Sequence, residues 1–362
     1  MRRRTFLTTA LACSIAHAAR SDDLEAAADL VGTQVAGGAV KGAVLDVRRD
    51  QDVFQRCYGS ALTVDAIFLL ASITKPMTAA GAMLLADRGE LKLADPVRRF
   101  IPEFSAGARS RITVKHLLTH TSGLPDQLPE NVELRKRNAP LSEFVERTIR
   151  TPLLFEPGTR YSYQSMGILL LAEICERVTG AAFPDYLEQS LFRPLGMERT
   201  ALGLGRIRLD ETQRSQVEQG PPHGGQGRAE AAHWDWNSRY WRELASPWGG
   251  AHSSAGDVSR FFLEFLAPDR AEVLRPATAA LMVRDHTPRL GRPRGLGFAL
   301  GRGAGAGCSE RTAWHGGATG TLAWADPQSG VRFVLLTTLP NTVANKLLIG
   351  PVSDLVSQAS QA

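Results

Sequence analysis

Ser72 and Lys75 are the two residues whose types and spacing point most directly to chemistry. Apolar residues follow with helical spacing, at Ile73, Met77, Ala80 and Leu84. Residues three apart on a helix share a face, with β-carbons about 5–6 Å apart, so we expect the serine hydroxyl beside the lysine ammonium. The positive end of the helix dipole would also favour a developing alkoxide. The pair therefore predicts an activated serine nucleophile.

A second candidate segment runs from Pro157 to Ser165 and contains Tyr161 and Tyr163. Pro-Gly at 157–158 predicts a turn, and the residues after it lead into a helix predicted over 166–178 that stops at Gly180. A tyrosine on a fixed loop before a helix can move protons when a nearby cation lowers its pKa. The simpler interpretation of a single tyrosine is a core or rim residue.

A third candidate is the glycine-rich run Trp314-His315-Gly316-Gly317-Ala318, which leads into a predicted strand. Glycines let a substrate approach the backbone closely, and a free N–H there can stabilise an oxyanion. The simpler interpretation is a tight turn before the strand.

The elements that must position these residues are strands at both ends of the chain with helices between them. A helix is predicted over 22–35 and strands over 42–47 and 53–58, joined by a turn at 49–52. Further strands are predicted over 320–324 and 331–336, followed by a closing helix from Val343. The pattern predicts an α/β (α+β) fold, with a sheet domain built from 22–85 and 250–362 and a mainly helical insert over 86–249.

The N-terminal segment predicts export. Arg2-Arg3-Arg4-Thr5-Phe6-Leu7 resembles a twin-arginine signal, and an apolar stretch leads to a cleavage pattern at Ala16-His17-Ala18. Residues 1–18 are therefore expected to be a signal peptide, with the mature protein periplasmic or secreted. No later segment suggests a membrane span. The net charge of +5 falls to about +2 without the three arginines, which is too little to indicate a nucleic-acid partner.

Several other features have plain interpretations. His116 and His120 lie one helical turn apart, but no third ligand accompanies them, so no metal is expected.

No Gly-x-Ser-x-Gly elbow occurs, which argues against an ordinary α/β-hydrolase. Four tryptophans are either core residues or the wall of a substrate cleft: Trp234, Trp236, Trp241 and Trp248. Three cysteines remain after signal removal and cannot all pair within one chain: Cys57, Cys175 and Cys308.

The three motifs, Ser-x-x-Lys at 72–75, Tyr-x-Ser at 163–165 and His-Gly-Gly at 315–317, occur in an order that resembles the serine β-lactamase and penicillin-binding-protein superfamily. Four further blocks support the resemblance, at 68–76, 89–97, 116–125 and 176–180. The nearest branches look like class C β-lactamases, D-Ala-D-Ala carboxypeptidases and family VIII esterases. The resemblance implies a β-lactamase/transpeptidase-like fold, with a central antiparallel sheet flanked by helices.

The resemblance also implies roles. Ser72 would be the acylated nucleophile and Lys75 its cationic neighbour. Counting back from Gly180 aligns Tyr163, and not Tyr161, with the family's general base and acid.

His315 would take the first place of the Lys-Thr-Gly motif, followed by Gly316 and Gly317. The N–H groups of Ser72 and Ala318 would form the oxyanion hole. Two residues depart from the family pattern. Ser165 replaces an asparagine that contacts the acylamide of a lactam or peptide, and His315 replaces a lysine.

Together these features predict an exported serine hydrolase that acts without a metal or organic cofactor. A carboxylic ester is the expected small-molecule substrate, because both departures remove contacts that lactams and peptides use. The alternatives are a D-amino-acid peptidase or carboxypeptidase and a β-lactamase. A non-catalytic relative that binds peptidoglycan is less favoured, because a binder does not require Ser72, Lys75 and Tyr163 together.

Overall fold

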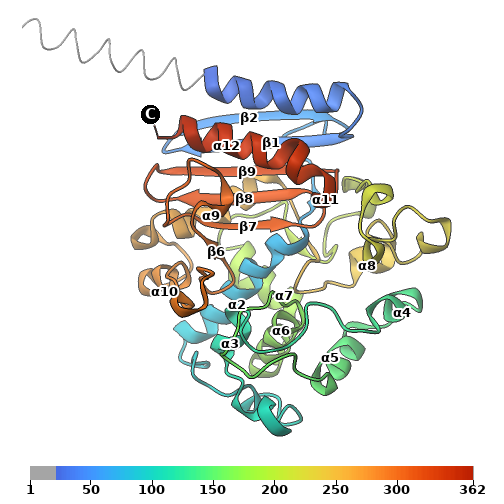
Figure 1. Cartoon of the computed structure of the whole chain (residues 1–362), viewed down its shortest axis with the longest axis vertical. Coiled ribbons are helices and arrows are strands. Elements are labelled where there is room, and N and C mark those ends of the chain that lie inside the picture. The colour runs from blue at the N-terminus through green and yellow to red at the C-terminus, as the bar shows by residue number, and fades with distance from the viewer. Residues whose placement is uncertain (1–21, 362) are drawn as a thin grey trace, which may run out of the picture.

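The computed structural model describes residues 22–361, so the predicted signal peptide lies outside the described chain. Its centre is a six-stranded antiparallel sheet in the order β2-β1-β9-β8-β7-β6 (Figure 1). The strands are β1 Gly42–Arg49, β2 Asp52–Gly59, β6 Ala299–Leu300, β7 Ala313–Gly317, β8 Thr321–Asp326 and β9 Val331–Thr337. Because β1 pairs with β9, the first and last strands of the chain lie side by side in the sheet.

Successive side chains of a strand point to opposite faces, and both faces of this sheet are covered. On one face Ala43, Leu45 and Val47 pack with the helix at residues 22–36 and with α12, Gly350–Ala359. On the other face Val44 belongs to the large core that contains α2, Thr74–Asp87, and α9, Ala255–Leu266. Full coverage explains why β1 and β9 are buried along nearly their whole length.

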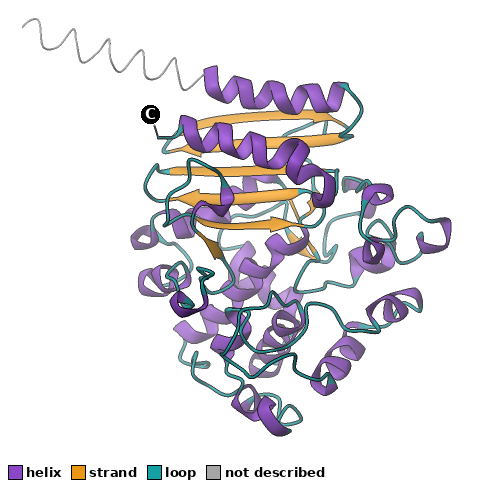
Figure 2. Cartoon of the chain, viewed as in Figure 1, coloured by secondary structure: helices purple, strands orange, loops and turns teal. Residues whose placement is uncertain are grey.

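Most of the remaining helices gather below the six-stranded sheet, together with loops and a second, smaller sheet (Figure 2). They are α3 Val114–Leu118, α4 Asn131–Lys136, α5 Leu141–Arg150, α6 Met166–Thr179, α7 Phe183–Leu187, α8 Arg239–Glu243 and α10 Pro276–Met282. Helix α11, Asn341–Ala344, lies beside the sheet instead, close to the start of α12. Helix α6 ends at Gly180, whose φ of 69° is the left-handed conformation that glycine adopts most readily. Among residues 22–361, no helix is long and apolar enough to cross a membrane.

Helix α2 differs from the amphipathic helix expected after Ser72. It is buried on all sides, including Lys75, because α6, α7 and the helical turn at 188–192 pack against it and Gly297 approaches Ala79 closely. The predicted apolar stripe is present, but small residues such as Ala79, Gly81 and Ala82 fill the other faces. The helix is therefore a central support and not a surface element.

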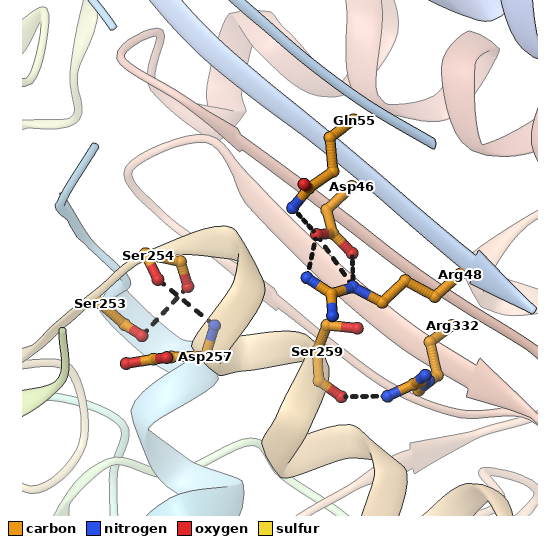
Figure 3. A network of polar contacts seen from close by, with 8 residues as sticks. All are labelled: Asp46, Arg48, Gln55, Ser253, Ser254, Asp257, Ser259 and Arg332. Carbon is orange, nitrogen blue, oxygen red and sulfur yellow. Dashed lines mark hydrogen bonds and ion pairs between the residues drawn. The ribbon is translucent and has the colours of Figure 1, made fainter. Parts of the chain in front are cut away.

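A network of polar groups links the sheet to α9 (Figure 3). The buried carboxylate of Asp46 accepts hydrogen bonds from Arg48, with Nη2 at 2.9 Å, and from Gln55. Arg332, opposite Arg48 in the neighbouring strand, donates to the Ser259 carbonyl oxygen of α9 at 3.2 Å. The Arg332 bond ties α9 to the sheet, while the Asp46 bonds stay within β1 and β2. Strand β5, Ala251–Ser253, leads directly into the first turn of α9.

Strand β5 is the middle of a second, three-stranded sheet between β3, Phe68–Leu69, and β4, Ala201–Leu202. Through β3 it reaches the chain that leads to Ser72.

The predicted fold class is confirmed, and so are the four longer strands and the helices at 22–36 and 166–179. The expectation that His315–Gly317 forms a turn before a strand is wrong in part. These residues form the end of strand β7, and the turn comes after them, at 318–320. The division into a sheet domain and a helical insert stays a prediction.

Candidate active site

Ser72 and Lys75 lie together where a short 3-10 turn, Ala71–Ile73, runs into α2. The Lys75 Nζ atom is 3.0 Å from Ser72 Oγ and donates a second hydrogen bond to the Trp248 carbonyl oxygen at 2.9 Å. The lysine side chain is fully buried, and this burial lowers its pKa to about 7. The Asp126 charge opposes that shift and the Arg294 charge adds to it. At neutral pH, therefore, Lys75 is available in both its charged and its neutral form.

The turn that presents Ser72 is held in an uncommon conformation. Ala71 has a φ of 49°, in the left-handed region that residues with a β-carbon rarely adopt. The Thr74 hydroxyl donates to the Ala71 carbonyl at 2.6 Å and accepts from the Ala251 N–H at 3.0 Å. The Leu70 N–H donates to the Ala251 carbonyl at 2.8 Å. Strand β5 thus fixes both sides of the turn, which keeps Ser72 in one position.

Tyr163 lies on the other side of this pair. The Lys75 Nζ atom is 4.8 Å from the centre of the Tyr163 ring, and the Ser72 hydroxyl is within hydrogen-bonding reach of the phenol. The pKa of Tyr163 is raised well above its ordinary value, mainly by burial, although the bond to Ser72 opposes the shift. The His120 ring packs on Tyr163 at 4.8 Å, and its Nδ1 accepts the Gln164 N–H at 3.2 Å. His120 therefore supports the loop that carries Tyr163.

Strand β7 closes the site from the sheet side. A β-carbon on Gly317 would lie 2.2 Å from the Leu70 carbonyl oxygen, so only glycine permits this close approach. Beyond the strand, the Thr319 hydroxyl donates to the Leu69 carbonyl at 2.7 Å, and the Thr321 hydroxyl to the Leu70 carbonyl at 2.8 Å. The Ala318 N–H has no acceptor among residues 22–361. The end of β7 is therefore fixed beside the turn that carries Ser72.

His315 lies on the same strand and is neutral at physiological pH. Its ring is buried, and burial together with the charges of Lys75 and Arg294 lowers its pKa to about 3. Its Nδ1 donates to the Gly316 carbonyl at 2.8 Å, which leaves Nε2 as an acceptor with no partner in the described chain. The ring centre is 6.1 Å from that of Tyr163.

Ser165, two residues after Tyr163, is buried and donates its hydroxyl hydrogen to Asp126 Oδ1 at 2.6 Å. Asp126 raises the pKa values of Lys75 and Tyr163, although other causes contribute more to each shift. The side chain that replaces the family's asparagine is therefore tied to a carboxylate at the edge of the site.

The structure brings together every site residue predicted from the sequence: Ser72, Lys75, Tyr163, Ser165, His315, Gly316, Gly317 and Ala318. Their catalytic roles stay predictions. Three contributors were not predicted. The Trp248 carbonyl, Asp126 and Arg294 approach the site from segments without a recognisable motif, although Asp126 directly follows the 116–125 block. The four tryptophans are all buried, as core residues would be. Cys57, Cys175 and Cys308 are free thiols.

Comparison with known proteins gives consistent matches. A family model described as Beta-lactamase matches residues 27–349. Esterase EstB of Burkholderia gladioli is 36% identical over 165 residues, which cover 41% of this chain and 42% of that protein. Penicillin-binding protein 4 of Amycolatopsis lactamdurans is 33% identical over 263 residues, covering 67% of this chain and 65% of that protein. The chain thus spans less than two thirds of the length of both relatives.

Two solved structures share the fold over nearly the whole chain. EstCE1, described as a hydrolase with promiscuous acyltransferase activity, superimposes with a TM-score of 0.77 at 23% identity, covering 96% of this chain and 100% of its own. A penicillin-binding protein homologue from Caulobacter crescentus gives 0.75 at 21% identity, covering 94% and 97%.

Proposed function

Because the chain belongs to the beta-lactamase family, whose members are serine hydrolases, we propose that it is an exported carboxylesterase that forms an acyl-enzyme on Ser72. The observation that carries this proposal is the 3.0 Å contact between Ser72 Oγ and the buried amine of Lys75, whose pKa is about 7. A lysine that is partly neutral at pH 7 can accept the proton of a serine hydroxyl.

Acylation begins when neutral Lys75 removes the Ser72 proton and Oγ attacks the carbonyl carbon of the ester. The N–H groups of Ser72 and Ala318 stabilise the oxyanion that forms, and one such donor contributes about 2.7–4 kcal/mol. The unpartnered N–H of Ala318 and the first N–H groups of a helix start, which have no intrahelical acceptor, support this assignment.

Tyr163 completes the proton path. Its raised pKa keeps the phenol protonated, so Tyr163 gives its proton to the departing alkoxide while it takes the proton that Lys75 removed from Ser72. Water then attacks the acyl-enzyme while Lys75 accepts one of its protons. Lys75 passes that proton to Ser72 Oγ, so Ser72 leaves as the free hydroxyl, the carboxylic acid is released and Lys75 is neutral again. This assigns the base of the first step to Lys75, where the sequence pattern favoured Tyr163.

The ester preference follows from the two departures from the family pattern. His315 carries no charge near pH 7, so strand β7 provides no cation for a substrate carboxylate. The Ser165 hydroxyl is occupied by Asp126 and presents no amide. An uncharged short-chain ester needs neither contact. The similarity to esterase EstB supports the same preference.

One observation favours a second candidate, a D-amino-acid peptidase. The Arg294 guanidinium lies 5.9 Å from the centre of the Tyr163 ring and adds positive charge to the site. That charge suits the carboxylate of a peptide.

Labelling with a fluorophosphonate, followed by peptide mass spectrometry, tests the proposal. We expect modification of Ser72, loss of labelling and of nearly all ester hydrolysis in Ser72→Ala, and a melting temperature within a few degrees of the native protein. Ser105→Ala, which changes an exposed serine outside the site, is the matched control and should retain both. Labelling that persists in Ser72→Ala would place the nucleophile elsewhere.

A further inference from the structure

Asp126 is a carboxylate at the site that the ester-hydrolysis mechanism does not use. Its Oδ1 atom accepts the Ser165 hydroxyl at 2.6 Å, and Ser165 lies two residues from Tyr163, which contacts Ser72. The side chain is half-buried, so it is neither sealed in the core nor free on the surface. Its position thus brings a negative charge close to the reacting groups.

This carboxylate has no basic partner within the described chain. None of the ion pairs formed by residues 22–361 includes Asp126. The two cations of the site are engaged elsewhere, because Lys75 bonds to Ser72 and Trp248 while Arg294 bonds to Tyr161. His223 is a third basic side chain whose pKa the Asp126 charge affects. Burial lowers its pKa to about 4, so it is neutral at pH 7.

A partly buried carboxylate without a counter-charge forms strong, charge-assisted hydrogen bonds with an ammonium group. We propose that Asp126 binds the primary ammonium group of the substrate, and that the preferred substrates are esters or amides of amino-bearing acyl groups, of which aminoacyl esters are the simplest. The inference rests on the proposed function, since it names the substrate class for the same Ser72 site. Asp126 lies close enough to Lys75 and Tyr163 for its charge to act on both, which favours an amine close to the scissile carbonyl.

The test compares three ethyl esters at pH 7, where an α-amino group is largely protonated. Alanine ethyl ester, in both enantiomers, carries the amine. Ethyl isobutyrate has a methyl group in its place, and N-acetylalanine ethyl ester has a neutral amide. We expect the native enzyme to hydrolyse one enantiomer of alanine ethyl ester with a kcat/KM at least about tenfold above that for both neutral esters.

Variants then separate amine binding from other effects of Asp126. Asp126→Asn should lower the ratio of kcat/KM for alanine ethyl ester to kcat/KM for ethyl isobutyrate at least about tenfold, because the loss of amine binding affects only the first substrate. Ser165→Ala removes the hydroxyl but keeps the carboxylate, so the preference for the amine should persist. Glu133→Gln, at an exposed carboxylate on α4, is the matched control and should behave as the native protein.

Equal losses on both esters in Asp126→Asn would overturn the inference, because the carboxylate would then act through Ser165 or Lys75. Absence of any preference for the amine in the native enzyme would overturn it as well. The proposed function fails separately: it is contradicted when ethyl isobutyrate hydrolysis is absent or survives Ser72→Ala.

Discussion

The Arg294 guanidinium donates a hydrogen bond to the Tyr161 hydroxyl and lies 4.8 Å from the centre of that ring. This contact turns the hydroxyl of Tyr161 towards Arg294, whereas the hydroxyl of Tyr163 lies by Ser72. The two tyrosines, two positions apart in the motif, therefore have different surroundings. The relationship gives a direct means of deciding which tyrosine moves protons.

We expect Tyr163→Phe to lower kcat for an activated ester about 10²–10⁴-fold, the range for loss of general acid–base assistance. Tyr161→Phe removes a hydroxyl whose hydrogen-bond partner among residues 22–361 is Arg294, and it should cost far less. Steady-state kinetics on p-nitrophenyl butyrate measures both, with melting temperatures as the control for folding. The reverse ranking would mean that the alignment of the motif is wrong by two residues.

The pH dependence should follow Lys75. Attack requires the neutral amine, so kcat/KM should fall as the pH drops through about 7, the pKa of Lys75 in the free enzyme. His315 is already neutral over that range, because its pKa is about 3. In His315→Gln, kcat/KM should therefore fall at the same acidic pH as in the native enzyme. A fall that disappears in this variant would assign the titration to the histidine.

Lys75→Met should abolish turnover and stabilise the fold. Burial lowers the lysine pKa from 10.5 to about 7, so between these values the unfolded chain binds a proton that the native protein does not. Native stability therefore falls as the pH decreases from about 10 to 7, and the variant lacks this loss. We expect its melting temperature to exceed the native value by a few degrees at pH 7. Methionine cannot donate a hydrogen bond to the Trp248 carbonyl, and the loss of that bond makes the increase smaller.

The advantage of Lys75→Met should shrink as the pH rises towards 10.5, because the unfolded native chain then loses the Lys75 proton as well and the difference in proton binding disappears. Thermal melts at pH 7, 8.5 and 10 measure the trend. A constant difference across this range would show that proton binding by Lys75 is not its cause.

Substrate choice is expected to favour esters over lactams. We predict that kcat/KM for p-nitrophenyl acetate or butyrate exceeds that for nitrocefin at least about tenfold, a difference of about 1.4 kcal/mol. The double variant Ser165→Asn with His315→Lys restores the family pattern and should narrow the gap. Faster hydrolysis of nitrocefin by the native enzyme would favour a β-lactamase instead.

Features with a local pattern were predictable from the sequence. Strands β1, β2, β8 and β9 have five or more residues of strand-forming composition, and α6 ends at a glycine. Strands β3 to β6 have two or three residues, too few for an alternating pattern to appear. At the end of β7 the sequence predicts a turn, because two glycines, which are uncommon within strands, occupy it.

The residues of the site likewise differ in how well the sequence predicts their positions. Ser72 and Lys75 were predictable because a helix turn alone sets their spacing. Asp126 and Arg294 were not, because their positions depend on packing between distant segments. The full burial of α2, which lowers the Lys75 pKa, likewise results from the elements packed around the helix. The sequence of α2 alone does not predict it.

The bond from the Thr321 hydroxyl to the Leu70 carbonyl joins residues 251 positions apart. Ribosomes add about 5–20 residues per second, so this partner follows the nucleophile by roughly 10–50 seconds. During that interval strand β1 also lacks β9, its neighbour in the sheet. A nascent chain consequently contains Ser72 and Lys75 long before it contains the groups that fix them. Hydrolytic competence should therefore be among the last properties gained during biosynthesis.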